Sequence, residues 1–222
     1  CLSVGIGWPT GMRPINAHKG ITMGSMDLLG QSGHSSDPDL GHNALDAMHS
    51  VIGELIVLLQ EMQARFQIPM FTIPRPTLNL GCIHGGDNPN RICGQCRLEF
   101  DIRLLPGMEI EALRDEIRRR VNPIAERFGV KATIAPMFAG LPAFMTAPEN
   151  ELVKTAERLT GHSAATVAFG TEAPHLQRLG MDTIVLGPGD IDQAHQPDEY
   201  LELDRVAPYL ETLKGLIRHY CL

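Results

Sequence analysis

The chain has 222 residues, of which 43% are hydrophobic and 20% charged, so it suits one large globular domain or two small ones. Its formal net charge is −7 and it lacks a long run of lysine and arginine, which argues against a nucleic-acid partner. No segment approaches the roughly 20 apolar residues that cross a bilayer, and no secretory signal precedes the first strand. We therefore predict a cytoplasmic protein without a membrane partner.

The chain opens at Cys1 without an initiator methionine, and residues 2–6 read as an apolar strand, which indicates an internal start. Apolar residues at alternating steps of three and four then predict two amphipathic helices, the second ending at Gly129. Pro123 lies inside the second helical pattern, so we expect a kink or a break just before it. The predicted segments are strand 19–29, helix 43–65, strand 77–84, strand 97–103, helix 110–128 and strand 130–134.

This order of elements is typical of the ferredoxin-like (βαββαβ) fold, a four-stranded antiparallel sheet with two helices on one face. In the strand 97–103, Leu98, Phe100 and Ile102 alternate with charged residues, so one face of that strand is predicted to be buried. We expect the domain to span residues 17–137 and to bury its own core.

The remainder of the chain alternates helices with short apolar strands, which is typical of a mainly parallel α/β sheet. We expect only two or three strands there, with residues 2–6 forming one more strand of the same sheet. The ferredoxin-like domain is thus predicted to be inserted between residues 1–16 and 138–222 of an incomplete α/β domain. The expected elements are helix 149–159, strand 165–168, helix 174–179, strand 183–186 and helix 206–220.

Five cysteines are scattered along the chain, and Cys93 and Cys96 form a C-x-x-C pair that suits zinc or redox chemistry. A zinc site would need a second pair or histidines at matching spacing, and neither follows. Residues 91–103 read as a strand, where positions three apart point to opposite faces. We interpret the pair as reduced cysteines.

Three polar clusters lie in predicted loops. His34, between glycine and serines, is placed to donate an imidazole N–H to a ligand or is a histidine of a surface turn. The loop 85–93, with Asn90 and Arg91, suits a carboxylate ligand and also reads as a hairpin between two strands. His195 follows a buried strand in a loop rich in glycine and acid, where an imidazole can bind a metal.

These clusters and the motifs around them resemble, in order and spacing, the M20 family of zinc metallopeptidases and deacylases, most closely its members that deacetylate N2-acetyl-L-ornithine. The resemblance covers nearly the whole chain. It rests on residues 17–20, 31–36, 77–81, 85–87, 90–93, 101–103, 105–108, 171–174, 186–189 and 195–200. It implies a zinc-peptidase-like α/β catalytic domain with an inserted ferredoxin-like lid through which two copies form a homodimer.

The resemblance also implies roles for residues of substrate binding and catalysis. His34 would be a catalytic residue that reaches the neighbouring subunit's site and stabilises the oxyanion of the tetrahedral intermediate. Asn90 and Arg103 would bind the substrate carboxylate. Gly170 and Thr171 would line the substrate pocket.

The implied cofactor is a pair of zinc ions, for which cobalt can substitute, and His195 matches the C-terminal zinc ligand of the family. The other ligands and the glutamate base would lie upstream of Cys1, except one acidic ligand expected at position 8, where this chain has Trp8. A tryptophan does not bind zinc. We therefore expect the chain by itself to be inactive.

The implied function is a zinc-dependent amidohydrolase that releases L-ornithine and acetate from N2-acetyl-L-ornithine in arginine biosynthesis. Related deacylases of acetylcitrulline, succinyl-diaminopimelate or another N-acyl amino acid are the nearest alternatives. The alternative from another class is a non-catalytic dimerisation module, which Trp8 favours and the intact His34 and His195 disfavour.

Overall fold

The computed structural model describes residues 3–194 and 196–222, which divide into two compact units. The four-stranded unit consists of Gly20–Pro69 and Ile73–Pro142. The five-stranded unit contains Met70–Thr72, Ala143–Leu222 and the segment up to Lys19, as far as the structure describes them. In the described part of the chain, no helix is both long and apolar enough to span a membrane.

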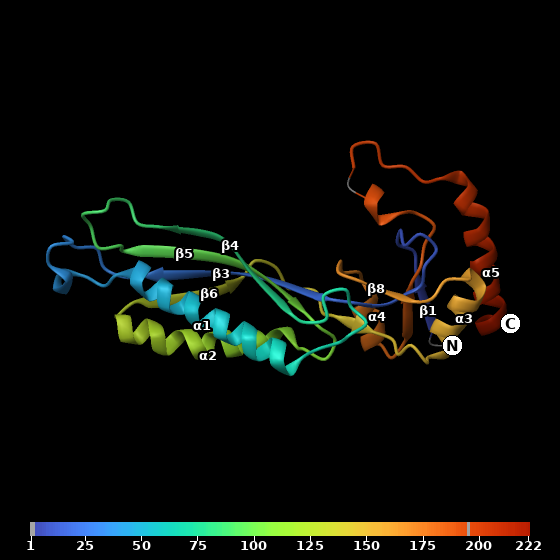
Figure 1. The fold of residues 1–222 in the computed structure, drawn as a ribbon, viewed down its shortest axis with the longest axis horizontal. Coiled ribbons are helices and arrows are strands. Elements are labelled where there is room, and N and C mark those ends of the chain that lie inside the picture. The colour runs from blue at the N-terminus through green and yellow to red at the C-terminus, as the bar shows by residue number, and fades with distance from the viewer. Residues whose placement is uncertain (1–2, 195) are drawn as a thin grey trace. The chain divides into compact units, whose positions relative to one another are not determined.

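The four-stranded unit has the strand order β4-β5-β3-β6, and every neighbouring pair is antiparallel. Its helices lie side by side on one face of the sheet (Figure 1). This topology confirms the predicted ferredoxin-like fold. The elements are β3 (Gly20–Leu29), a short 3-10 helix (Pro38–Leu40), α1 (Ala44–Arg65), β4 (Thr77–Gly85), β5 (Gln95–Leu104), α2 (Ile110–Phe128) and β6 (Lys131–Pro136).

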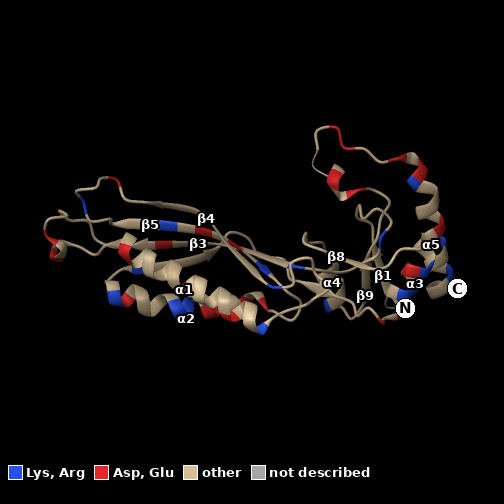
Figure 2. Cartoon of the chain, in the orientation of Figure 1, with Lys and Arg blue, Asp and Glu red and all other residues tan. Residues whose placement is uncertain are grey.

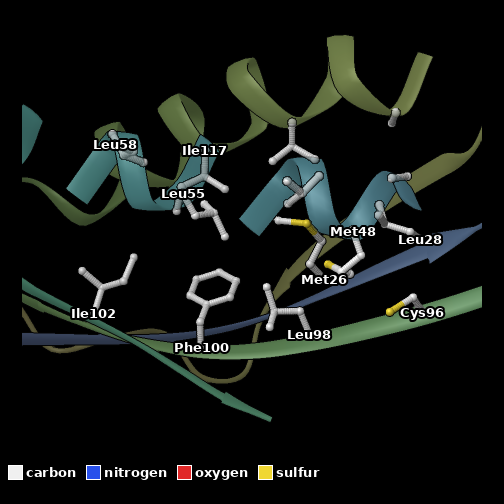
Figure 3. Close-up of a cluster of buried hydrophobic side chains, with 14 of the residues drawn as sticks. Met26, Leu28, Met48, Leu55, Leu58, Cys96, Leu98, Phe100, Ile102 and Ile117 are labelled. Carbon is white, nitrogen blue, oxygen red and sulfur yellow. The ribbon is translucent and has the colours of Figure 1, made fainter. Parts of the chain in front are cut away.

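The core of this unit lies between β5 and the two helices. Leu98, Phe100 and Ile102 of β5 point toward α1 and α2 (Figure 3), as their period-two pattern predicted. They pack there against buried residues of the helices such as Leu55 and Ile117. Sheet and helices thus bury a common apolar layer, which makes the unit a candidate to fold independently.

The sequence indicates where helix α1 begins and where helix α2 ends. The Asn43 side chain caps α1 by accepting hydrogen bonds from two backbone N–H groups of its first turn. Gly129 ends α2 in the left-handed conformation, with φ of 66°. The expected break at Pro123 is wrong, because α2 runs through it without interruption. Proline removes a single helical hydrogen bond, and the burial of Val121 and Ala125 on either side holds the helix.

The C-x-x-C pair also differs from the prediction. β5 begins at Gln95, so Cys93 precedes the strand and the two sulfur-bearing side chains are not forced onto opposite faces. Cys93 and Cys96 are both buried in the same core, 7% and 0% exposed. The cysteines that the structure describes are all free thiols.

The five-stranded unit contains a sheet with the order β1-β9-β2-β7, and β8 pairs with β2. The pairs β1–β9 and β2–β8 are parallel, whereas β2 is antiparallel to both β7 and β9. The elements are β1 (Ser3–Ile6), β2 (Ile15–His18), β7 (Phe144–Met145), α3 (Glu151–Thr160), β8 (Ala165–Val167), α4 (Ala173–Arg178), β9 (Asp182–Val185), two 3-10 helices (Ile191–Gln193 and Leu203–Arg205) and α5 (Val206–Cys221).

This sheet confirms that the first strand of the chain joins the C-terminal strands. The C-terminal part contributes three strands, β7, β8 and β9, which agrees with the two or three expected there. The expected mainly parallel pairing is wrong, because β2 joins the sheet and is antiparallel to both β7 and β9. The strands β2 and β7 were not predicted. They are four and two residues long, too short for a periodic pattern to develop.

Candidate functional site

The His34 loop and the loop before β5 are bound to each other in the four-stranded unit. His34 forms an isolated antiparallel bridge with Arg91. On either side, Ser35 N–H donates to the Asn90 carbonyl at 3.0 Å and Ile92 N–H donates to the Gly33 carbonyl at 2.9 Å. Two of the three predicted polar clusters therefore form one surface recess of about 360 Å³. The residues that line it are Ser32, Gly33, His34, Asn90 and Arg91.

The hydrogen bonds of His34 determine which ring nitrogen carries the proton. Nδ1 accepts from the backbone N–H of Ser36 at 3.3 Å and lies 2.8 Å from the Ser36 hydroxyl. A backbone N–H can only donate, so in the neutral ring Nδ1 is the acceptor and Nε2 carries the hydrogen. Nε2 has no hydrogen-bond partner among the residues that the structure describes, and the side chain is exposed. The ring can therefore donate to a group outside the unit.

Asn90 is exposed beside His34, and its neighbour Arg91 forms an ion pair with Asp87 at 2.5 Å. The same loop joins β4 to β5 as a hairpin, so the hairpin interpretation of the sequence is also confirmed. The recess thus offers neutral donors, with the arginine charge balanced by a carboxylate.

Arg103 lies near the other end of β5, opposite Ile21 and Thr77 in the neighbouring strands. Its Nε donates to Asp101 at 2.9 Å. At about 3.3 Å per strand residue, the length of β5 puts Arg103 on the order of 25 Å from the loop that holds Asn90. One copy of the chain therefore does not bring Asn90 and Arg103 to the same carboxylate.

Thr171, predicted to line the substrate pocket, is buried and bonded to a histidine to which we assigned no role. His18 Nε2 accepts from the Thr171 backbone N–H at 3.0 Å, and Nδ1 lies 2.9 Å from the Lys19 carbonyl, to which it donates. The Thr171 hydroxyl accepts from Ala173 N–H at the start of α4. Gly170 precedes Thr171 in the same loop and is half-buried. His18 thus positions the loop.

His18 is fully buried and packs edge-on against Phe144. Burial lowers the pKa of its ring, an effect that hydrogen bonds from the neighbouring backbone only partly oppose. Both ring nitrogens are occupied, so the side chain serves the structure rather than a ligand. The signal for it was a histidine at the end of the short apolar segment that forms β2.

Trp8 lies in the loop after β1 and contacts the same region. Its indole Nε1–H donates to Glu172 Oε2 at 2.9 Å. Its ring stacks on Phe169, with centroids 5.9 Å apart and planes inclined by 20°. The sequence placed Trp8 and Glu172 in separate motifs, 164 residues apart, and did not indicate this contact.

The described residues do not form a zinc site. Within residues 3–194 and 196–222, no three His, Cys, Asp or Glu side chains lie together in a way that could hold a metal ion. Trp8 presents a hydrogen-bond donor, which is not a metal ligand, and occupies an oxygen of Glu172. His195, the predicted zinc ligand, lies outside the described residues.

A model of the M20 peptidase dimerisation domain matches residues 16–128. The chain is 45% identical, over 216 residues, to acetylornithine deacetylases from Salmonella arizonae and Salmonella paratyphi B. The match covers 97% of this chain and 56% of each relative, so the chain spans about half the length of the curated relatives that it matches.

Solved structures share the fold at lower identity. Aminopeptidase PepT from Bacillus cereus superposes with a TM-score of 0.72 at 19% identity, over 95% of this chain and 54% of that one. A tripeptidase from Staphylococcus aureus superposes with a TM-score of 0.66 at 18% identity, over 98% and 54% of the two chains.

Proposed function

Since the chain belongs to the M20 family through its peptidase dimerisation domain, we propose that it is the C-terminal portion of an amide hydrolase that converts N2-acetyl-L-ornithine to L-ornithine and acetate. The observation that carries this proposal is the 45% identity to acetylornithine deacetylases across 97% of the chain. The reaction would take place in the cytoplasm, in arginine biosynthesis.

Residues 17–137 would be the lid, inserted between two pieces of the catalytic domain, residues 1–16 and 138–222. The four-stranded unit has its own core and supports this assignment. The catalytic pieces would contribute the loop around Gly170 and Thr171, held by His18, to the substrate pocket.

The lid would also join two copies into a homodimer. The edge strand β4 is mostly exposed and, within the described residues, pairs with β5 alone. Leu45, Ile56 and Val57 of α1 are exposed apolar side chains. In the dimer, the free Nε2–H of His34 would donate to the oxyanion in the partner's site, beside Asn90. Arg103, at the other end of β5, would then bind a substrate carboxylate in a different site from the one that Asn90 serves.

The catalytic metal would be zinc, with cobalt as a substitute, which polarises the amide carbonyl when bound. His195 would be one ligand, and the remaining ligands and the general base would come from the part of the relatives that this chain does not cover. The chain alone would then not catalyse hydrolysis. A related deacylase of acetylcitrulline, succinyl-diaminopimelate or another N-acyl amino acid remains the nearest alternative substrate assignment.

A non-catalytic dimerisation module is the second candidate function, and the contact of Trp8 with Glu172 favours it. The two functions are separated by a chimera in which the uncovered part of the Salmonella arizonae enzyme precedes this chain. Hydrolysis of N2-acetyl-L-ornithine is measured with added zinc or cobalt, and with a chelator as control.

We expect no turnover by the chain alone and chelator-sensitive turnover by the chimera carrying Trp8→Glu. The matched chimera that keeps Trp8 should be slower. An inactive Trp8→Glu chimera that is folded and dimeric would favour the non-catalytic module. Chelator-sensitive turnover by the 222-residue chain alone would show that its metal ligands are residues other than those assigned here.

A further inference from the structure

Helix α5 of the five-stranded unit has three flanks of different character. Tyr209 and Leu216 pack on the core that α3 and β9 form, and α3 lies beside α5 (Figure 1). A second flank is charged, because Glu211 and Lys214 form an ion pair at 2.7 Å and Arg218 is exposed one turn further on. The third, the apolar flank, consists of Leu203, Val206, Leu210, Leu213 and Ile217.

The apolar flank runs along α5 and the 3-10 helix that precedes it. Its residues recur at steps of three and four, which places them in one line on a helix of 3.6 residues per turn. Leu203, Leu210 and Ile217 are 85%, 48% and 53% exposed, and the two residues between them are half-buried. A helix flank that faces water carries polar residues, as the charged flank of α5 does, so this line of apolar side chains indicates a contact surface.

The edge of the sheet next to α5 is open as well. β1 stands at one end of the strand order and, within residues 3–194 and 196–222, pairs with β9 alone. A Cβ at Gly7, the residue after β1, would lie 3.3 Å from the Tyr209 hydroxyl, so α5 adjoins this strand. Because β1 is parallel to β9, a segment that continued the parallel pairing would need crossover helices on the faces of the sheet.

The relatives contain chain that can occupy both surfaces. The match covers 97% of this chain but 56% of each acetylornithine deacetylase, so a long segment of the relatives has no counterpart here. A second copy of α5 could cover the apolar flank, but that contact would not involve the β1 edge. The two adjoining open surfaces therefore favour one segment that supplies both a helix and a strand.

We propose that the apolar flank of α5 is the docking surface for an amphipathic helix from the part of the relatives that this chain does not cover, and that the β1 edge receives a strand from the same part. This inference rests on the proposed function, in which the chain is the C-terminal portion of the hydrolase. Docking there holds residues 138–222 against the part that would supply the remaining metal ligands.

Co-expression of two separate polypeptides tests the docking surface. One is the 222-residue chain with an affinity tag, and the other is the uncovered part of the Salmonella arizonae enzyme. The complex is captured through the tag, and biolayer interferometry measures its dissociation constant. Ile217→Glu and Leu210→Glu each place a carboxylate on the apolar flank. Arg218→Glu places the same side chain on the charged flank and is the matched control.

We expect Arg218→Glu to bind the uncovered part within about threefold of the wild-type affinity. Ile217→Glu and Leu210→Glu should each weaken binding about a hundredfold, because the contact would bury an unpaired carboxylate. Circular dichroism should show the same helical content in all three variants, since the three side chains are exposed. In the covalent chimera, Ile217→Glu should lower the urea midpoint by more than Arg218→Glu does.

Equal affinity of the wild-type chain and both apolar-flank variants would overturn the proposal, and so would equal urea midpoints of the two chimera variants. Self-association of the chain alone that Ile217→Glu abolishes would also overturn it, by assigning the flank to a second copy. Association and hydrolysis are separate readouts, so the two proposals fail separately. Flank-dependent association with an inactive Trp8→Glu chimera would support the docking surface and refute the deacetylase. An active chimera with flank-independent association would do the reverse.

Discussion

The buried His18 makes the stability of the five-stranded unit depend on pH. The ring is 0% exposed, with Nδ1–H donating to Lys19 and Nε2 accepting from Thr171 N–H. Burial lowers its pKa below the ordinary value of 6.5. Protonation of Nε2 would place an N–H against the Thr171 N–H and bury a charge without a partner.

The direction of the pH effect on stability depends on whether His18 binds a proton more tightly in the folded or in the unfolded chain. Because the pKa is lower in the folded state, the unfolded chain takes up the proton first as the pH falls. The contribution of neutral His18 to the free energy of unfolding is complete above about pH 6.5. It is lost as the pH falls toward the folded-state pKa, with a slope of at most about 1.4 kcal/mol per pH unit. His18→Ala should cost roughly 3–5 kcal/mol at pH 7.5, since it unpairs two buried backbone groups and leaves a cavity.

Urea unfolding followed by Trp8 emission measures this effect, since Trp8 packs on the core of the same unit. We expect the midpoint of the wild-type chain to fall between pH 7.5 and 5.5 by more than that of His18→Gln, whose amide can pair with the same two backbone groups. His162→Gln, an exposed histidine of this unit, is the matched control and should behave as wild type. An identical pH dependence in wild type and His18→Gln would refute the reasoning.

Two further predictions concern the four-stranded unit. Leu55→Ala, at a fully buried position, should lower the free energy of unfolding by about 3 kcal/mol in urea titrations followed by circular dichroism, whereas Gln60→Ala, at an exposed polar position of α1, should change it by less than about 0.5 kcal/mol. Hydrogen bonds from Arg119 and Arg120 lower the pKa of Glu116 from 4.5 to about 2, so its stabilising contribution is present above pH 4.5 and lost as the pH falls toward 2. Solvent screening limits this contribution to about 1 kcal/mol. In urea titrations, Glu116→Gln should therefore lower the free energy of unfolding by up to that amount at pH 5 and by less at pH 2.5.

Elements with long periodic patterns could be predicted from the sequence. Helix α2 shows why, because its apolar residues recur over five turns while both signs of charge follow its outer surface (Figure 2). The alternation in β5 likewise predicted which face is buried. Once two such helices and four strands are in order along the chain, few topologies remain, and the ferredoxin-like one was correct.

Elements that depend on distant partners could not be predicted. β7 is two residues long and exists because it pairs with β2, more than 120 residues earlier in the chain. Local patterns also misjudged Pro123 and Cys93, one held in a helix by packing and the other placed outside a strand by the hairpin loop. In each case tertiary packing overrode a correct local tendency.

The candidate site depends on such distant contacts throughout. The sequence indicated His34 and Asn90 separately, and only the backbone hydrogen bonds between their loops bring them into one recess. The same structure separates Asn90 from Arg103 by most of β5, so two residues assigned to one carboxylate belong to opposite ends of a strand. A substrate held by both residues therefore requires two copies of the chain, whereas a substrate held by Arg103 alone requires one. Because His34 lies with Asn90, any oxyanion contact it makes must come from the same copy as Asn90, and the two residues should lose their effect together when dimerisation is prevented.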